Sequence, residues 1–335
     1  MTQRQKQAWL LWIGWSLAGV VLILALAADE GEATSLFSRS TLAIVLSLAP
    51  LVGAQLALGS PQVLATVREW LAHSRRPLMH TAGGVVTLYL MAGLIHGRFD
   101  PYAAAIFGVG AYAALGALSQ LKPGQPGLTW VDGAIWLLLW IPFDLRWNYD
   151  LWFGPEGFNY SWWAVAISVM AVIGWGSLRG LPNFGYRLAP RWSDLGWALL
   201  FTGIFAAIVI PIGLAIDFLA FPPSQAPALG AVLAAAVGIF LTVAIPEELF
   251  FRGVLLHGLD QMAERSWWPL LLSSLAFGLM HWNNAGDLST RIAYVALATL
   301  AGIVYGLAYR RSGNNLLAAA LVHTLVDLIW RFGFR

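Results

Sequence analysis

The chain has 335 residues, of which 59% are hydrophobic and only 11% are charged, and its formal net charge is +2. Soluble domains carry roughly 25% charged residues, so this composition excludes an ordinary soluble protein and predicts a chain embedded in lipid. The basic residues are spread thinly over predicted loops, so nucleic acid is not an expected partner. The absence of cysteine excludes disulfides, thiol nucleophiles and thiolate metal sites.

Long apolar runs alternate with loops that contain Pro and Gly, which predicts an all-α, polytopic bundle of transmembrane helices. A helix needs about 20 residues to cross a ~30 Å hydrocarbon core, and the runs at 128–143 and 267–282 are the shortest. No soluble domain fits between the runs. We expect about eleven spans, near 8–28, 41–59, 81–97, 102–120, 128–143, 160–178, 194–221, 228–258, 267–282, 292–309 and 315–331.

Two features of the N-terminal part bear on the membrane. A basic start, an apolar run and a small-residue stretch resemble a signal peptide, but the run at 8–24 is longer than the usual ~7–15 residues, so we expect an uncleaved first helix. Residues 63–76 mix basic and apolar side chains, which fits an amphipathic helix on the membrane surface; a solvated loop fits the same residues.

The basic residues also predict an orientation. With the N-terminus inside and eleven spans, 13 of the 19 Lys and Arg residues face the cytoplasm and 6 face outward. Because cytoplasmic loops carry an excess of Lys and Arg, we expect a multi-pass integral protein of a bacterial-type cytoplasmic membrane with its N-terminus inside.

The first chemical motif is a pair of adjacent carboxylates, Glu247 and Glu248, inside apolar sequence. An acidic residue at the centre of a membrane helix costs roughly 2.5–3.5 kcal/mol, so such residues persist mainly where they face a polar cavity. Pro246 disfavours helical geometry at Ile245. We therefore expect the run 228–258 to break near Pro246, with both glutamates in the first turn of a new half-helix, where the helix dipole favours negative charge.

The spacing within this motif predicts two different roles. Glu248 and Arg252 are four residues apart, so they can pair on one helix face, while Glu247 points about 100° away. We expect Glu248 and Arg252 to form a structural ion pair and Glu247 to be the reactive group. The alternative is that both glutamates pair with cations and only hold helices together.

Two further motifs each contain a histidine. His281 follows Phe277 by four residues, so the two rings can pack, and His323 and Asp327 share a face of the last predicted span. A carboxylate one turn away can fix the tautomer of an imidazole. Taken alone, His281 also fits an interfacial histidine, and the His323 and Asp327 pair also fits a polar contact between helices.

Together the three motifs predict a hydrolytic site. Glu247 and His281 would activate a water molecule that attacks a peptide carbonyl, and His323 would donate to the developing oxyanion. Because the site lies in predicted spans, we expect membrane-embedded or lipidated peptide and protein substrates within the lipid bilayer.

The pattern Glu-Glu-x-x-x-Arg, then Phe-x-x-x-His, then His-x-x-x-Asn/Asp, in polytopic membrane sequence, resembles the CPBP family. The name joins CAAX proteases and bacteriocin-processing enzymes; the family is also called Abi and includes the type II CAAX prenyl endopeptidases. The resemblance covers about 230–331. It implies an intramembrane glutamic endopeptidase core, which we place in 160–335, after transmembrane helices of unknown role in 1–159.

The resemblance also implies roles for particular residues. Glu247 and His281 would activate water, and His323 with the residue four positions later would form the oxyanion site. That residue is Asp327 here and Asn in the prenyl endopeptidases, and an ionised Asp cannot donate a hydrogen bond. We therefore expect Asp327 to orient His323. Glu248 and Arg252 would be the structural pair, with Phe277 in support.

Three other functions remain open at this stage. Two His and a Glu could bind zinc, as in a metalloprotease, but no His-Glu-x-x-His helix is present, and we expect no metal or other cofactor. A non-catalytic immunity or scaffold protein could use the same fold. A proton-coupled transporter could use Asp132 and Asp217, which lie in or near predicted spans.

Overall fold

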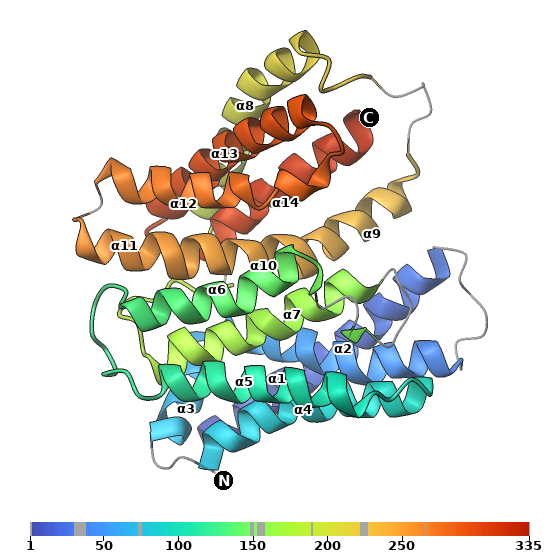
Figure 1. Ribbon diagram of the computed structural model, residues 1–335, viewed down its shortest axis with the longest axis vertical. Coiled ribbons are helices and arrows are strands. Elements are labelled where there is room, and N and C mark those ends of the chain that lie inside the picture. The colour runs from blue at the N-terminus through green and yellow to red at the C-terminus, as the bar shows by residue number, and fades with distance from the viewer. Residues whose placement is uncertain are drawn as a thin grey trace. The chain divides into compact units, whose positions relative to one another are not determined.

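The computed structural model describes residues 2–29, 38–72, 76–147, 151–152, 158–188, 190–221, 227–264 and 266–334. Within these ranges the regular structure is entirely helical, which confirms the predicted all-α fold (Figure 1). The chain divides into two compact units, Met1–Phe184 and Gly185–Arg335, called here the first and the second unit.

Nine helices of the described ranges are long and apolar enough to cross a membrane, which confirms a multi-pass membrane protein. The expected count of about eleven is not confirmed. The difference lies in the two shortest runs, which form α6 (Trp130–Asp144) and α12 (Trp267–Leu279), of 15 and 13 residues.

In the first unit, α2 is the central helix and contacts α1, α4 and α7. Close approach of α1 to α2 depends on Gly53, where an added Cβ would collide with the hydroxyl and backbone of Ser16. The amphipathic segment after α2 is a helix, α3. The helices of this unit are α1 (Gln3–Asp29), α2 (Arg39–Leu58), α3 (Pro61–Ala72), α4 (Arg76–His96), α5 (Pro101–Leu118), α6, and α7 (Asn159–Ala171), which continues as the π-helix η3 (Val172–Leu178).

The first unit ends at Phe184, whereas the sequence predicted a division after residue 159. The difference arises because α7 packs against α2, and η3 packs against α3 and α5, all within the first unit. The indole of Trp162 on α7 donates a hydrogen bond to Ser47 on α2, and both residues are fully buried.

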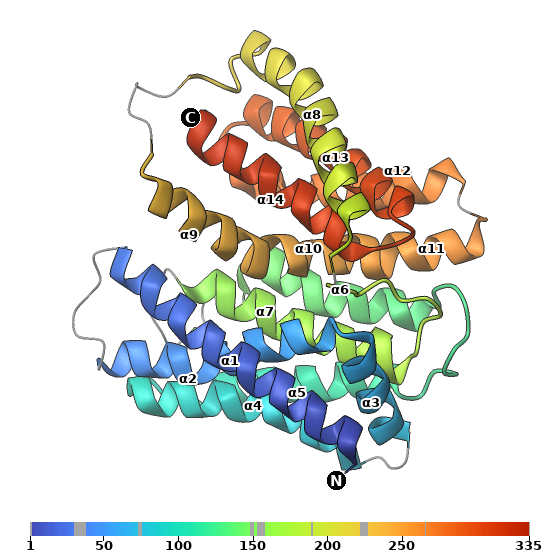
Figure 2. The ribbon, with the colours of Figure 1, turned by 180° about the vertical axis from the view of Figure 1, so that it is seen from behind.

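In the second unit, α13 and α14 lie at the centre: α13 contacts α8, α12 and α14, and α14 contacts α8 and the long helix that contains α10 (Figures 1 and 2). Asp287 caps α13 and Asn315 caps α14 by accepting backbone hydrogen bonds. The elements are α8 (Trp192–Ala215), α9 (Leu229–Ile239), η4 (Phe240–Ala244), α10 (Ile245–Glu248), η5 (Leu249–Leu256), α11 (His257–Met262), α12, η6 (Trp282–Asn284), α13 (Leu288–Arg311) and α14 (Leu316–Gly333).

The helix break expected near Pro246 is wrong. Leu229–Met262 is one continuous helix, and Ile245 has helical angles of φ −60° and ψ −51°. π-helical turns lie on both sides of Pro246, in η4 and η5. Such turns shift the backbone hydrogen-bond register and accommodate a proline inside a helix. The two glutamates therefore lie in the middle of a helix and not at its N-terminus.

Candidate active site

The first motif contains a buried ion pair. Oε1 of Glu248 accepts a hydrogen bond from Nη1 of Arg252 at 2.8 Å, and neither side chain is exposed. Nη2 of Arg252 donates to the carbonyl of Gly302 on α13 at 3.1 Å. The guanidinium also lies 4.5 Å from the ring centre of Phe277 and 5.2 Å from that of Tyr305. Arg252 thus joins the long helix to α12 and α13.

The same carboxylate holds an imidazole from the last helix. Nδ1 of His323 lies 2.9 Å from Oε1 of Glu248, and Tyr305 stacks on the His323 ring at 4.8 Å with an interplanar angle of 20°. The i, i+4 spacing predicted Arg252 as the partner of Glu248, and the structure places His323 against the same carboxylate. Glu248 therefore fixes both a cation and a ring.

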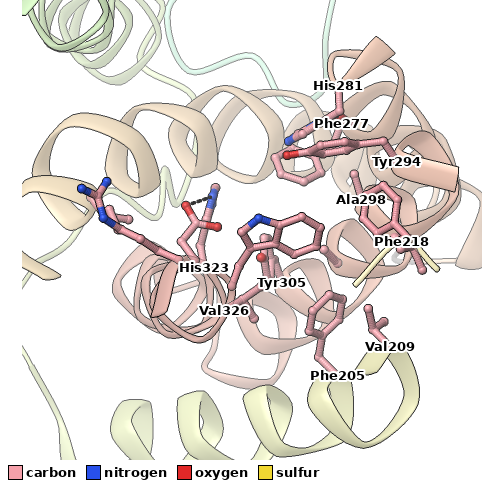
Figure 3. Close-up of a pocket in the computed structure, with 16 residues that line it drawn as sticks. Phe205, Val209, Phe218, Phe277, His281, Tyr294, Ala298, Tyr305, His323 and Val326 are labelled. Atoms are coloured by element: carbon pink, nitrogen blue, oxygen red, sulfur yellow. Dashed lines mark hydrogen bonds and ion pairs between the residues drawn. The ribbon is translucent and has the colours of Figure 1, made fainter. Parts of the chain in front are cut away.

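The other nitrogen of His323 faces two more carboxylates. Nε2 lies 3.6 Å from Oδ2 of Asp327, as the dashed line in Figure 3 marks, and 3.9 Å from Oε2 of Glu247. The side chains of Glu247 and Asp327 are 12% and 35% exposed, whereas that of Glu248 is 0% exposed. Glu247 and Asp327 are therefore the carboxylates that solvent or a ligand can reach.

His281 is held at the end of α12 by its neighbours. Its Nδ1 lies 2.9 Å from the carbonyl oxygen of Phe277, and the two rings pack with centroids 4.9 Å apart. On the other side, Tyr294 of α13 stacks on the imidazole at 5.3 Å and 27°. The buried ring of Phe277 also packs edge-on against His323 at 5.8 Å, so it separates and positions the two histidines.

Both histidines and Asp327 line a cavity of about 380 Å³, called here the site cavity. Figure 3 shows His281 and Tyr294 on one side of it, His323 on another, and Phe205 and Val209 from α8 on a third. Much of the remaining wall is apolar. The lining residues on the other elements include Ile239, Phe277, Leu297, Ala298, Ala301, Tyr305, Val326 and Asp327.

A second cavity, of about 420 Å³, shares Phe218, Tyr294 and Trp330 with the site cavity and is called here the side cavity. Its other walls are more polar, with Asp217, Asn284, Ser289 and Thr290 among them. The two cavities are thus neighbours across an aromatic wall.

The N-terminus of α13 borders the side cavity. Hydrogen bonds from the Ser289 hydroxyl and the Thr290 amide lower the pKa of the Asp287 carboxyl, which stabilises the charged form of this helix cap. The cap fixes the start of the helix that carries Tyr294.

The structure thus brings Glu247, Glu248, Arg252, His323 and Asp327 into one cluster, and it places His281 on the wall of the adjoining cavity. Tyr294 and Tyr305 of α13, which line the site cavity, were not among the site residues predicted from the sequence. A signal was present, because positions 294, 298, 301 and 305 recur at helical spacing and share one face.

Residue types alone left zinc open as a cofactor. Within the ranges that the structure describes, no three His, Cys, Asp or Glu side chains are arranged so that they could hold a metal ion. The cluster around His323 therefore does not fit a zinc site in this geometry.

The fold and this cluster define a class: an integral, multi-pass membrane protein in which glutamates contact a buried histidine that lines a cavity. The model of one family, described as type II CAAX prenyl endopeptidase Rce1-like, matches residues 228–329. The match covers all three motifs and confirms the family resemblance seen in the sequence. This family is a protease family. No curated protein and no solved structure matches the chain.

Proposed function

We propose that the protein is an intramembrane endopeptidase that hydrolyses peptide bonds of membrane-embedded or lipid-anchored substrates. One observation carries the proposal: Glu247, Glu248 and Asp327 surround the single imidazole of His323 beside a cavity that His281 also lines. The protease-family match over the same residues supports peptide hydrolysis as the reaction.

Glu247 is the carboxylate best suited to act as the general base. Oε1 of Glu248 already accepts from Arg252 and lies against His323, and this side chain is fully buried. Glu247 lies on the Nε2 side of His323 and keeps some exposure. A base must reach the proton that it removes, so Glu247 takes the proton of the attacking water and passes it to the leaving amine when the C–N bond breaks.

His281 is suited to help Glu247 activate the attacking water. A carbonyl oxygen only accepts hydrogen bonds, so the contact with Phe277 requires the proton of the neutral ring on Nδ1. Nε2 then carries the lone pair. His281 thus supplies the second acceptor that, with Glu247, polarises water.

His323 is suited to stabilise the oxyanion. Donation from Nε2 requires a proton there, while Nδ1 needs its own proton to donate to Glu248. Both nitrogens are then protonated, and Glu248 and Asp327 balance the charge. An ionised Asp327 cannot donate to an oxyanion, so its role is to orient the ring. Removal of one such hydrogen-bond donor typically lowers kcat by a factor of about 10²–10³.

The two cavities indicate the form of the substrate. Apolar side chains of α8, α9 and α13 in the site cavity suit a lipid anchor or an apolar residue, and the polar walls of the side cavity suit peptide groups. The peptide would extend from one cavity to the other past the shared side chains of Phe218, Tyr294 and Trp330. The family description names prenylated CAAX substrates, which combine an apolar anchor with a peptide.

The experiment uses the full chain in liposomes with two internally quenched reporter peptides. One carries a C-terminal farnesylated cysteine and the other is fused to a single transmembrane helix. We expect the wild type to cleave at least one reporter and Glu247→Gln to slow cleavage by about 10²–10⁴-fold, as expected for loss of a general base. Glu264→Gln, the same change at an exposed position, is the matched control.

Two outcomes contradict the proposal. One is that the wild type cleaves neither reporter, and the other is that Glu247→Gln, with an unchanged unfolding transition, cleaves at the wild-type rate. A chelator should leave the rate unchanged. Loss of activity with the chelator and its return with Zn²⁺ would replace this mechanism by metal-dependent hydrolysis.

A further inference from the structure

The first unit contains a cavity of about 790 Å³, called here the N-terminal cavity, which plays no part in the proposed hydrolysis. It lies between α1, α2, α3, α4 and the α7–η3 helix. Both α1 and α4 pack against α2, and α1 crosses α2 obliquely (Figure 2). The volume lies within the ~300–1,000 Å³ typical of small-molecule sites.

The lining of the N-terminal cavity changes along its length. The polar lining side chains lie near the starts of α1 and α4 and in the middle of α3: Gln5, His80, Thr81 and Thr66. Farther along α1 and α4 the walls are apolar, with Trp12, Leu88 and Met91, and the lining residues Leu46 and Pro50 of α2 are apolar too. The cavity therefore matches an amphiphile with one polar end and one apolar chain.

The length of the lining from its polar end to its apolar end matches one leaflet of a bilayer. On α4 the lining runs from His80 to Met91, and the 11 steps of ~1.5 Å between these two residues span about 16 Å. Half of a ~30 Å hydrocarbon core is about 15 Å. A chain in this cavity would thus extend from the interface to the middle of the bilayer.

The polar end of the N-terminal cavity has a net positive charge. In sequence, Arg4 and Lys6 flank the lining residue Gln5 on α1, and Arg68 follows Val67 on α3, where its guanidinium also donates to the carbonyl of Gly176 at 2.6 Å. Glu69 forms an ion pair with Arg4 at 3.6 Å, which offsets only one of these charges. The predicted N-inside orientation assigns this end to the cytoplasmic leaflet, where anionic lipids gather.

We propose that the N-terminal cavity binds one acyl chain of an anionic phospholipid, with the phosphate at Arg4, Lys6 and Arg68. The polar-to-apolar lining, the single-leaflet depth and the net positive rim together select this occupant. Trp9 and Trp70, both partly exposed in the lining, suit the headgroup level, where tryptophan is enriched.

The test fills the cavity with a side chain. Gly84 lines it, and a Cβ added there meets no atom within 4 Å, so Gly84→Phe can enter the open space. Gly110 on α5 also has open space around an added Cβ but does not line the cavity, so Gly110→Phe is the matched control. The probe is phosphatidylglycerol with a photoreactive diazirine near the end of one acyl chain, in nanodiscs.

After irradiation, mapped peptides of the wild type should carry the label on the cavity walls of α2 and α4. We expect Gly84→Phe to lower this labelling at least tenfold and Gly110→Phe to leave it unchanged. Equal labelling in Gly84→Phe would overturn the proposal. If that variant does not fold, the wild type decides, because label confined to the exposed face of α8 would overturn the proposal equally.

A second comparison tests the headgroup. Each basic group near an anionic lipid surface favours binding about fivefold, so Lys6→Gln should lower the preference for phosphatidylglycerol over phosphatidylcholine by about that factor. Lys122→Gln, an exposed lysine outside the cavity, is the control. Equal labelling by both lipids in the wild type would refute an anionic occupant.

Discussion

Each unit contains a fully buried arginine–carboxylate pair, and the two differ in how completely their hydrogen bonds are satisfied. In the first unit, Arg179 lies 3.4 Å from Asp132. Asp132 also accepts from the Trp175 indole and from the backbone and hydroxyl of Thr129, in a capping box at the start of α6. The guanidinium donates further to the carbonyls of Lys122, Gln125 and Gly127.

In the second unit, the pair of Glu248 and Arg252 is less complete. Oε2 of Glu248 and Nε of Arg252 are buried and have no hydrogen-bond partner within the part of the chain that the structure describes. Oε1 is shared between Arg252 and His323. His323, which contacts Glu248, lines the site cavity. Arg179, in contrast, ties the loop before α6 to the end of η3.

The contrast separates two uses of buried charge. A saturated pair holds a fold together, while a pair with unsatisfied atoms next to an imidazole and a cavity indicates a functional site. The sequence raised Asp132 as a possible proton carrier, but the structure shows it engaged on both oxygens, and Asp217 is exposed. Asp132 therefore gives a transporter no support.

The largest expected effect is on the saturated pair. Arg179→Met leaves a buried carboxylate and three carbonyls without their donor, so we expect a loss of at least about 3–5 kcal/mol in the free energy of unfolding. Thermal and denaturant unfolding in detergent measures this. An unchanged transition would show that the saturated pair does not hold the first unit together.

Neutralising both partners separates stability from activity in the second unit. Arg252→Met alone should cost about 3–5 kcal/mol, and the double variant Glu248→Gln/Arg252→Met should recover most of that loss, because no buried charge stays unpaired. Cleavage of the reporter should remain low in the double variant. Recovery of cleavage together with stability would make this pair purely structural.

The tyrosine that stacks on His323 should have an intermediate effect. Tyr305→Leu removes the stacked ring and the cation–π contact with Arg252, worth about 1–2 kcal/mol together, and should lower kcat with little change in KM. Tyr305→Phe keeps both contacts and is the control. A loss in Tyr305→Phe as large as that in Tyr305→Leu would assign the role to the hydroxyl instead.

The smallest expected effect is at Asp327. If Asp327 orients His323 through its charge, Asp327→Asn should lower kcat by about tenfold, a free-energy change of about 1.4 kcal/mol. If the residue itself donates to the oxyanion, Asn would always supply an N–H donor. Activity in Asp327→Asn equal to or above the wild type would therefore contradict the orienting role.

The sequence was sufficient for the helical membrane fold and for the three motifs, because hydropathy and i, i+4 spacing report them directly. It did not predict the continuous helix through Pro246, since local proline rules cannot show that π-helical turns accommodate the ring. The contact between Glu248 and His323 joins residues 75 positions apart, so only the packing of α14 on the long helix reveals it.

The most direct measurement compares the reporter cleavage rate per folded molecule in Glu248→Gln and Asp132→Asn, the same type of change in the two buried pairs. Glu248 holds His323, so we expect Glu248→Gln to lower the rate by about 10²-fold, as a small misplacement of a catalytic group does. Folded Asp132→Asn should stay within about twofold of the wild type. Equal rates in the two variants would contradict the account.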